Sequence, residues 1–267
     1  ILSKKLVTLH KKVEIKIAIG DLELTTLNLK KLLVFTKMME FNALSKRISS
    51  QLDEFNSSGT SQGDQRELMP SENYQVIQTE DALNRWCNKI FKQKVFAIDT
   101  ETTSLDTLSA EIVGISICVG SGQACYIPIA HETGQPEYKE LEQNQLDRDM
   151  VLEKLRPLLA DKSILKIGHN IKFDIKVLDK YECQLNSFDD TMLMSHCING
   201  GRQRHNLDSV VKNLLSFETI KLKDLIGSGK KEINFKNVPI SLAANYAAED
   251  ADMTFRVWKI LKEDLVK

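Results

Sequence analysis

The sequence has few cysteines and no long hydrophobic run. Its five cysteines are odd in number and form no CxxC pair, which argues against a disulfide framework and against a zinc site. We therefore expect free thiols in a reducing cytoplasm. No stretch approaches the ~18 apolar residues that would span a bilayer, and the first residues lack the apolar core of a signal peptide.

The chain also has almost no net charge. Its formal charge of −1 shows no basic excess of the kind that marks many nucleic-acid-binding proteins. A nucleic acid can still be held by local contacts and metal ions, so this absence weakens such a function without excluding it. Because the chain begins with Ile1 rather than Met, we expect it to be part of a longer polypeptide.

A polar segment divides the chain. Residues 49–73 are rich in Ser, Gly, Gln, Asp and Glu and have little apolar periodicity, which predicts a flexible linker. The residues before it, 1–48, contain a strand-like alternation at 13–19 and a helical pattern at 27–41. That piece is short for an independent core. The longer piece, 74–267, carries the denser signals.

Residues 74–267 predict a mixed α/β domain. Alternating apolar residues with turn residues between them predict three antiparallel strands in a row, at 95–101, 111–120 and 123–130. One further strand is predicted at 164–167. Helical patterns surround these strands, at 79–91, 146–161, 171–181, 189–199, 206–215 and 242–265. This order indicates a mixed sheet with helices packed against it.

Two carboxylates lie two residues apart at the end of the first of these strands, in "VFAIDTE". Successive strand side chains point to opposite faces, so Ala97, Asp99 and Glu101 share one face. Two like charges on one face repel unless water, hydrogen bonds or a cation offsets the repulsion. The motif by itself fits either a strand that runs out into a polar loop or half of a metal site.

A second motif, "GHNIKFD", follows the strand at 164–167. Asn170 and Asp174 are four residues apart, so a helix that begins at Asn170 would carry both on one face. The carboxylate of Asp174 could then point back over the end of the strand. The simpler interpretation is an Asn N-cap followed by a solvated Asp.

A third motif, "YAAED", lies inside the last predicted helix. Tyr246 and Asp250 are again one turn apart on a single face, and small residues between them leave room for another element to approach closely. An acidic, exposed side of the helix would account for Glu249 and Asp252. It would not explain a phenol one turn before a carboxylate.

Together the motifs have the order Asp-x-Glu, Asn-x-Lys-Phe-Asp and Tyr-x-x-x-Asp. This order resembles the exonuclease motifs of the DEDD superfamily in its tyrosine branch; the histidine branch would have His where this chain has Asn245. The phrases "AIDTETTSLDTLSAEIVGISI", "KIGHNIKFDIKVL" and "NYAAEDADMTFRVW" resemble the 3′→5′ proofreading exonuclease domain of bacterial DNA polymerase I, of family A. That resemblance covers residues 74–267. Residues 1–48 resemble the end of the 5′ nuclease domain of the same polymerases.

The resemblance implies a fold and a position in a longer chain. The fold would be ribonuclease H-like, of the α/β class, with a mixed sheet of about five strands flanked by helices. The polymerase domain would begin where this chain stops.

The resemblance also implies a catalytic set: Asp99, Glu101, Asp174, Tyr246 and Asp250. The four carboxylates would bind two divalent ions, Mg²⁺ or Mn²⁺, which prefer hard oxygen ligands. Asp99 would bridge both ions, with Glu101 and Asp250 completing the first site. Asp174 would serve the second ion through water. Two ions about 3.5–4 Å apart could activate a water and stabilise the leaving 3′ oxygen. Tyr246 would hold and orient that water together with Glu101. A phenol with a pKa near 10 is a poor base, so the metal would do most of the deprotonation.

Further residues would contact DNA by the same resemblance. The family has an apolar wedge at the position of Leu105, which could as well be an ordinary core leucine. His169 and Asn170 would contact the terminal nucleotides, and Phe173 would line a single-strand groove. Arg204 is either a phosphate contact or a solvated loop residue.

The resemblance implies a 3′→5′ exonuclease that removes nucleotides from single-stranded or frayed DNA 3′ ends, as the proofreading part of a DNA polymerase I in replication and repair. The expected partners are a DNA 3′ end and the polymerase domain of the same chain. We expect a monomer in the bacterial cytoplasm, associated with the nucleoid and not with a membrane. One departure from the family is Leu222, where an aromatic residue can occur, so base stacking at that position is in doubt.

Two other functions remain open at this point. The domain could be a structural module without catalysis, although all five catalytic residues are present. It could also be an RNA-trimming exonuclease like RNase D, which uses the same motifs, although the polymerase-like N-terminal residues argue against this. Comparing RNA and DNA oligomers as substrates would separate these functions.

Overall fold

The computed structural model describes residues 2–9, 20, 27–39, 41–56, 74–133, 140–141, 143–229 and 232–266. The chain forms two compact units, residues 1–68 and residues 69–267. The strand predicted at 13–19 lies outside the described residues. Within the described ranges, no helix combines the length and the apolarity needed to cross a membrane.

The first unit is helical in its described part. It contains α1 (Leu2–Val7), α2 (Leu29–Met38) and α3 (Asn42–Asn56). The predicted helical pattern at 27–41 is confirmed as α2, which begins where the Asn28 side chain accepts a hydrogen bond from the Lys31 backbone N–H at 3.0 Å.

Helix α3 corrects one feature of the sequence interpretation. The helix runs through residues 49–56, which the polar composition had assigned to the flexible linker. Ile48, Leu52 and Phe55 recur at helical spacing there, and Ile48 is buried. Because Ser and Gln are frequent in this segment, these few apolar residues were not recognised as a helical pattern. The domain boundaries themselves remain a prediction.

The second unit is built on a mixed sheet of six strands in the order β1-β4-β3-β2-β7-β8. The central strands β2, β3 and β4 are antiparallel, and β7 and β8 extend the sheet in parallel beyond β2. The strands are β1 (Gln75–Val76), β2 (Val95–Thr102), β3 (Ile112–Cys118), β4 (Ala124–Pro128), β7 (Leu165–Gly168) and β8 (Phe188–Asp190). A separate pair is formed by β5 (Glu132–Thr133) and β6 (Glu140–Leu141).

The prediction of a mixed sheet is thus confirmed, with six strands where the resemblance implied about five and the sequence patterns showed four. The four predicted strands are β2, β3, β4 and β7. Strands β1 and β8 were missed because two or three residues are too few for an alternating pattern. The helix predicted at 189–199 begins only at Thr191, since Phe188–Asp190 pairs with β7 first.

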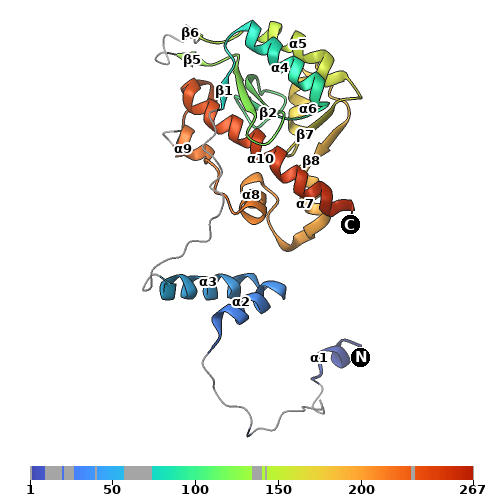
Figure 1. Cartoon of the computed structure of the whole chain (residues 1–267), viewed down its shortest axis with the longest axis vertical. Helices are drawn as coiled ribbons and strands as arrows, with labels where there is room; N and C mark the ends of the chain where they lie inside the picture. The colour runs from blue at the N-terminus through green and yellow to red at the C-terminus, as the bar shows by residue number, and fades with distance from the viewer. Residues whose placement is uncertain are drawn as a thin grey trace. The chain divides into compact units, whose positions relative to one another are not determined.

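Helices cover both faces of the sheet (Figure 1). On one face α4 (Glu80–Gln93), α5 (Arg148–Ala160) and α6 (Lys172–Asp179) pack on a core that includes Phe96 and Ile98 of β2. On the other face Ala97 of β2 packs against α10 (Ile240–Val266). The alternation along β2 therefore turns Asp99 and Glu101 toward α10.

Helix α10 lies close to the sheet because its facing side chains are small. Ala243, Ala247, Ala248 and Ala251 have no exposed surface, as expected where small residues meet another element. Along its other side pack α7 (Thr191–Asn199) and α8 (Leu207–Leu215). The remaining short helices are η2 (Gly200–Arg202), α9 (Leu222–Ile226) and η4 (Phe235–Asn237).

The interpretation of Glu249 and Asp252 as an exposed acidic side of α10 is wrong. Both are buried. Glu249 accepts a hydrogen bond from the Ile220 backbone at 2.6 Å, and Asp252 accepts one from the Gly122 backbone at 2.8 Å. Neither partner is a neighbour in sequence, so helical periodicity alone could not have found them.

Tyr126 of β4 and His131, just after this strand, form a buried polar pair. The Tyr126 side chain fills the space beside Gly114, where an added Cβ would come within 2.0 Å of the Tyr126 hydroxyl. His131 Nδ1 lies 3.0 Å from the Val238 carbonyl oxygen, and its Nε2 lies 2.7 Å from the Tyr126 hydroxyl. A carbonyl can only accept, so Nδ1 carries the proton and Nε2 accepts from Tyr126. His131 is thereby held in its neutral form, and its bond to Val238 connects it to the residues just before α10.

Because His131 is buried in its neutral form, we expect the folded protein to lose stability in acid. Burial lowers the pKa of His131 to about 4 in the folded protein, below the ~6.5 of an unfolded chain. Its contribution is present above pH 6.5 and is lost as pH falls toward 4, because the unfolded state binds the proton first. Urea unfolding at pH 7 and pH 4.5 should show wild type losing about 2–3 kcal/mol more than His131→Asn. Equal losses in the two proteins would contradict this account.

Candidate active site

The predicted catalytic residues meet in one cleft of about 470 Å³. Strand β2, helix α6 and helix α10 supply its carboxylates and Tyr246, and an apolar wall is formed by Leu222, Ile226, Ile233 and Phe235. Nine of the ten residues predicted to act in catalysis or DNA binding line this cleft: Asp99, Glu101, Leu105, His169, Asn170, Phe173, Asp174, Tyr246 and Asp250. Arg204 is exposed and is not among the lining residues.

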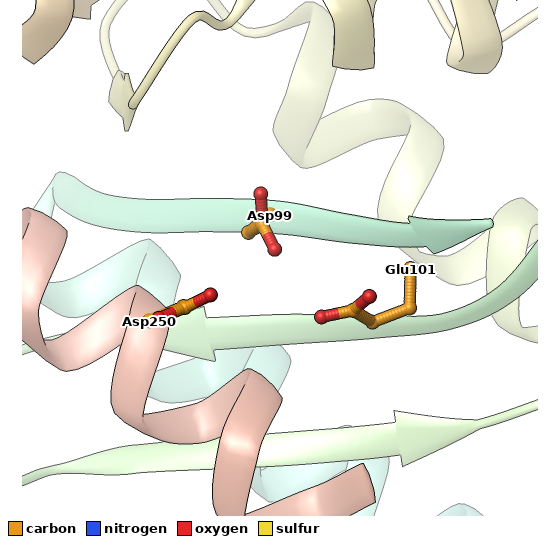
Figure 2. A group of neighbouring side chains, drawn as sticks. All are labelled: Asp99, Glu101 and Asp250. Carbon is orange, nitrogen blue, oxygen red and sulfur yellow. The ribbon is translucent and has the colours of Figure 1, made fainter. Parts of the chain in front are cut away.

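Three carboxylates converge at the centre of the cleft. Asp99 and Glu101 come from β2 and Asp250 from α10, as Figure 2 shows. One oxygen of each lies within 4.8 Å of an oxygen of the other two. A register shift between Glu101 and Thr102 marks a bulge at the end of β2, of the kind that re-aims side chains at functional sites.

The electrostatics of this group favour a bound cation. Burial raises the pKa of Asp99 to about 6. Burial, together with the neighbouring carboxylates, raises the pKa values of Glu101 and Asp250 well above their ordinary range. Glu101 Oε1 is buried and has no hydrogen-bond partner among the described residues. An unpartnered buried carboxylate oxygen beside two others fits a hard divalent cation, which would offset their repulsion.

Asp174 reaches the end of β2 from the other side of the sheet. Its Oδ1 accepts hydrogen bonds from the Thr100 backbone N–H at 2.9 Å and from the Thr100 hydroxyl at 2.6 Å. Burial and the charge of Asp99 raise the pKa of Asp174, while the Thr100 hydrogen bonds lower it. The Asp174 carboxylate therefore has a fixed orientation beside the three others. Its service to a second ion through water remains a prediction.

Tyr246 lies one turn before Asp250, as predicted, with its ring 6.1 Å from that of Phe235. Burial and the charges of Asp250, Glu101 and Asp99 raise the pKa of the phenol, and a hydrogen bond with Asp250 acts in the same direction. The hydroxyl therefore keeps its proton at neutral pH. It can donate a hydrogen bond in the cleft, but it cannot act there as a base.

The second motif forms a tight turn between β7 and α6. Gly168 allows it, because an added Cβ would come within 2.7 Å of the Ile171 side chain. Asn170 takes the left-handed conformation, with φ of 63°, which asparagine tolerates better than most residues. His169 Nδ1 lies 2.8 Å from the Thr191 hydroxyl, and burial lowers the pKa of His169 to about 4. It presents a neutral ring to the cleft.

Leu105 is not a core leucine, since 88% of its surface is exposed. It follows β2 in a loop that Asp106 stabilises by accepting hydrogen bonds from the Leu108 backbone and the Ser109 hydroxyl. Lys180 donates to two carbonyls of the same loop, those of Leu108 and Ala110. A leucine held in solvent by an ordered loop at the edge of the cleft is available to a ligand. Leu222 lines the apolar wall.

Sequence reasoning missed Thr100, which fixes the orientation of Asp174. The only signal available was its position between Asp99 and Glu101, on the opposite face of β2. It also missed Asp190, whose hydrogen bonds reach the second motif from the neighbouring strand.

Comparisons with known proteins agree with this geometry. A family model described as 3′-5′ exonuclease matches residues 74–266. The DNA polymerase I of Pseudomonas aeruginosa is 34% identical over 99% of this chain, which spans 28% of that protein. The DNA polymerase I of Rhizobium leguminosarum is 37% identical over 72% of this chain, which spans 20% of that protein. The chain thus covers less than a third of these relatives.

A solved structure supports the fold. Escherichia coli RNase D, an exoribonuclease involved in structured RNA processing, aligns with a TM-score of 0.54 and 22% identity. The alignment covers 72% of this chain and 45% of RNase D. At this identity the likeness concerns the fold alone, and it confirms the predicted ribonuclease H-like exonuclease architecture. The match over residues 74–266, with the carboxylate cleft inside it, shows that the chain belongs to the 3′→5′ exonuclease family of the DNA polymerase A type.

Proposed function

We propose that this exonuclease removes nucleotides from single-stranded or frayed DNA 3′ ends, as the proofreading part of a DNA polymerase I. The observation that carries the proposal is the group of Asp99, Glu101 and Asp250, whose carboxylate oxygens converge within 4.8 Å of one another in the cleft that Tyr246 also lines. The choice of DNA is supported by the relatives, which are named DNA polymerase I.

Two divalent ions, Mg²⁺ or Mn²⁺, would occupy the carboxylate group. Asp99, Glu101 and Asp250 would hold the first, and Asp99 with Asp174 the second. When bound, such ions supply a water that ionises near neutral pH and charge stabilisation for the leaving oxygen. Thr100 keeps Asp174 oriented, and β2 and α10 keep the other three carboxylates in place.

Tyr246 would hold the attacking water by donating a hydrogen bond from its hydroxyl group, since its raised pKa keeps it protonated. Tyr246→Phe should lower kcat on a single-stranded oligomer by about 10–100-fold, because positioning is worth a large part of such a rate. Metal affinity should stay within about twofold, as expected for a group that is not a ligand. Calorimetric Mn²⁺ titration tests this; loss of an ion in Tyr246→Phe would contradict the assigned role.

The exposed Leu105 would pack against the last bases of the DNA strand. Leu105→Ala should raise KM for a single-stranded oligomer about fivefold, for a lost contact of ~1 kcal/mol. Leu108→Ala is the matched control: Leu108 belongs to the same loop and is 86% exposed, but it does not line the cleft. Equal effects of the two substitutions would count against a specific contact at Leu105.

The remaining parts of the proposal concern the longer protein. Residues 1–48 would be the end of a 5′ nuclease domain, and 74–267 the exonuclease domain. Residues 49–73 would connect them, with 49–56 forming the last part of α3. A polymerase domain of the same polypeptide would deliver the DNA end, in a monomer of the bacterial cytoplasm. His169, Asn170, Phe173 and Arg204 would contact the strand.

The direct test of substrate class compares a DNA and an RNA oligomer of one sequence. The proposal expects faster shortening of the DNA from its 3′ end, in the presence of Mg²⁺ or Mn²⁺. Preference for the RNA oligomer would favour an RNase D-like function instead. No shortening of either would favour a structural module.

A further inference from the structure

Asp190 connects four backbone groups from two separate segments. Its carboxylate is buried at the end of β8, next to β7. Oδ1 accepts hydrogen bonds from the backbone N–H groups of Asn170 at 3.1 Å, Met192 at 2.9 Å and Leu193 at 3.2 Å. Oδ2 accepts one from the Ile171 backbone N–H at 3.1 Å. Asp190 therefore caps α7 and also holds the turn that leads into α6.

The turn into α6 needs such an outside acceptor. The first N–H groups of a helix have no partner within it, and Ile171, at the N-cap of α6, makes no side-chain capping bond. Asn170 is moreover in a left-handed conformation, which persists only where surrounding contacts hold it. The two hydrogen bonds from this turn to Asp190 provide that support across the sheet edge.

The position of α6 matters because it carries part of the cleft. Phe173 and Asp174 lie in its first turn, and both line the cleft. The Asp174 carboxylate must meet Thr100 to make its bonds of 2.9 and 2.6 Å. A shift at Ile171 would move this carboxylate with the helix.

We propose that Asp190 is a positioning residue of the exonuclease site. Acting through the backbone of Asn170 and Ile171, it sets the Asp174 carboxylate against the end of β2. Asp190 itself is not among the residues that line the cleft. The inference rests on the proposed function, because a displaced Asp174 would show its effect in the rate of the exonuclease reaction.

Asp190→Asn removes the bond from Ile171 while it leaves the cap of α7 in place. Asparagine is a good N-cap, so its single amide oxygen can replace Oδ1 and keep the bonds from the N–H groups of Asn170, Met192 and Leu193. Its NH₂ group would then face the Ile171 N–H, where a donor replaces an acceptor. Asp189→Asn is the matched control. Asp189 is the neighbour on β8, and its Oδ2 accepts from Trp258 Nε1 at 2.7 Å and Lys262 Nζ at 2.9 Å, outside the cleft.

The experiment measures kcat and KM on a single-stranded DNA oligomer with Mn²⁺, together with melting temperature. Asp190→Asn should lower kcat about 10–100-fold, as misplacement of a catalytic group does, with little change in KM. Both variants should lower the melting temperature to a similar extent. Asp189→Asn should nevertheless leave kcat within about twofold of wild type. Equal losses of kcat in the two variants would overturn the proposal.

A double-mutant cycle tests the route through Asp174. In an Asp174→Ala background, Asp190→Asn should have little further effect on kcat, because residues acting as one unit are not additive. Additive losses would overturn the proposal. Hydrogen exchange gives a readout independent of activity: the Ile171 amide should exchange faster in Asp190→Asn, and unchanged exchange would also overturn it. A wild-type chain without exonuclease activity would instead refute the proposed function.

Discussion

Asp99→Asn should reduce cleavage of single-stranded DNA by at least about 10³-fold, or ~4 kcal/mol of transition-state stabilisation, while the protein stays folded. Asp99 belongs to the carboxylate group and stands on β2, on the face that packs against α10. Asparagine keeps its size but supplies no charge to hold a divalent cation. The fold does not depend on that charge, because the core on both faces of β2 is apolar.

The stability of the metal-free variant gives a second readout. The folded-state pKa of Asp99 is raised to about 6 by burial, above the ~3.9 of an unfolded chain. Its contribution to stability is fully present below about pH 4 and is lost as pH rises through 6. In EDTA, Asp99→Asn should therefore melt higher than wild type at pH 8, with a smaller difference at pH 5.

Glu111→Gln serves as the control for this pair of measurements. Glu111 is an exposed carboxylate just before β3 and does not line the cleft. Its substitution should leave both rate and melting temperature nearly unchanged. Cleavage by Asp99→Asn within about tenfold of wild type, worth only ~1.4 kcal/mol, would rule out the assigned metal site.

A matched duplex end should be degraded orders of magnitude more slowly than the same strand alone. The carboxylates line a cleft of about 470 Å³ between β2, α6 and α10, so paired bases must separate before a 3′ end can reach them. Separation costs roughly 1–2 kcal/mol per step in stacking alone. Two or three opened steps then cost about 2–6 kcal/mol, which predicts a penalty of roughly 30-fold to 10⁴-fold.

The chain offers little to offset that cost. Its net charge of −1 gives no general attraction for a long duplex. A mismatched end has already lost part of its pairing and should be cleaved at an intermediate rate. The measurement compares initial rates on one labelled strand, presented alone, with a terminal mismatch, and fully paired at moderate salt. Equal rates on the three forms would contradict this substrate preference.

Much of the site could be predicted because it follows local periodicities. The two-residue repeat of a strand put Asp99 and Glu101 on one face, and the structure turns that face toward α10. The four-residue repeat of a helix put Tyr246 beside Asp250, and both line the cleft. These relations depend on backbone geometry alone, so a single sequence contains them.

Other features depend on contacts between distant residues and could not be read from a pattern. The second motif alone fitted a solvated Asp174 as well as a site residue, and its hydrogen bond from Thr100 could not be predicted from the pattern. Asp252 looked exposed, yet Gly122 and Tyr74 donate to it from other parts of the fold. Leu105 fitted a core leucine as well as a wedge, and its exposure in the structure excludes the core leucine. Strands β1 and β8 exist because longer strands pair with them.

The most direct test of the central claim uses a 5′-labelled single-stranded DNA oligomer with the wild-type chain, in Mg²⁺ or Mn²⁺ and in EDTA. The account predicts a ladder of products that shortens from the 3′ end with either ion. It predicts no products in EDTA or with Asp99→Asn. Release of the label as a short 5′ fragment at the start, or undiminished cleavage in EDTA, would contradict a metal-dependent 3′→5′ exonuclease built on these carboxylates.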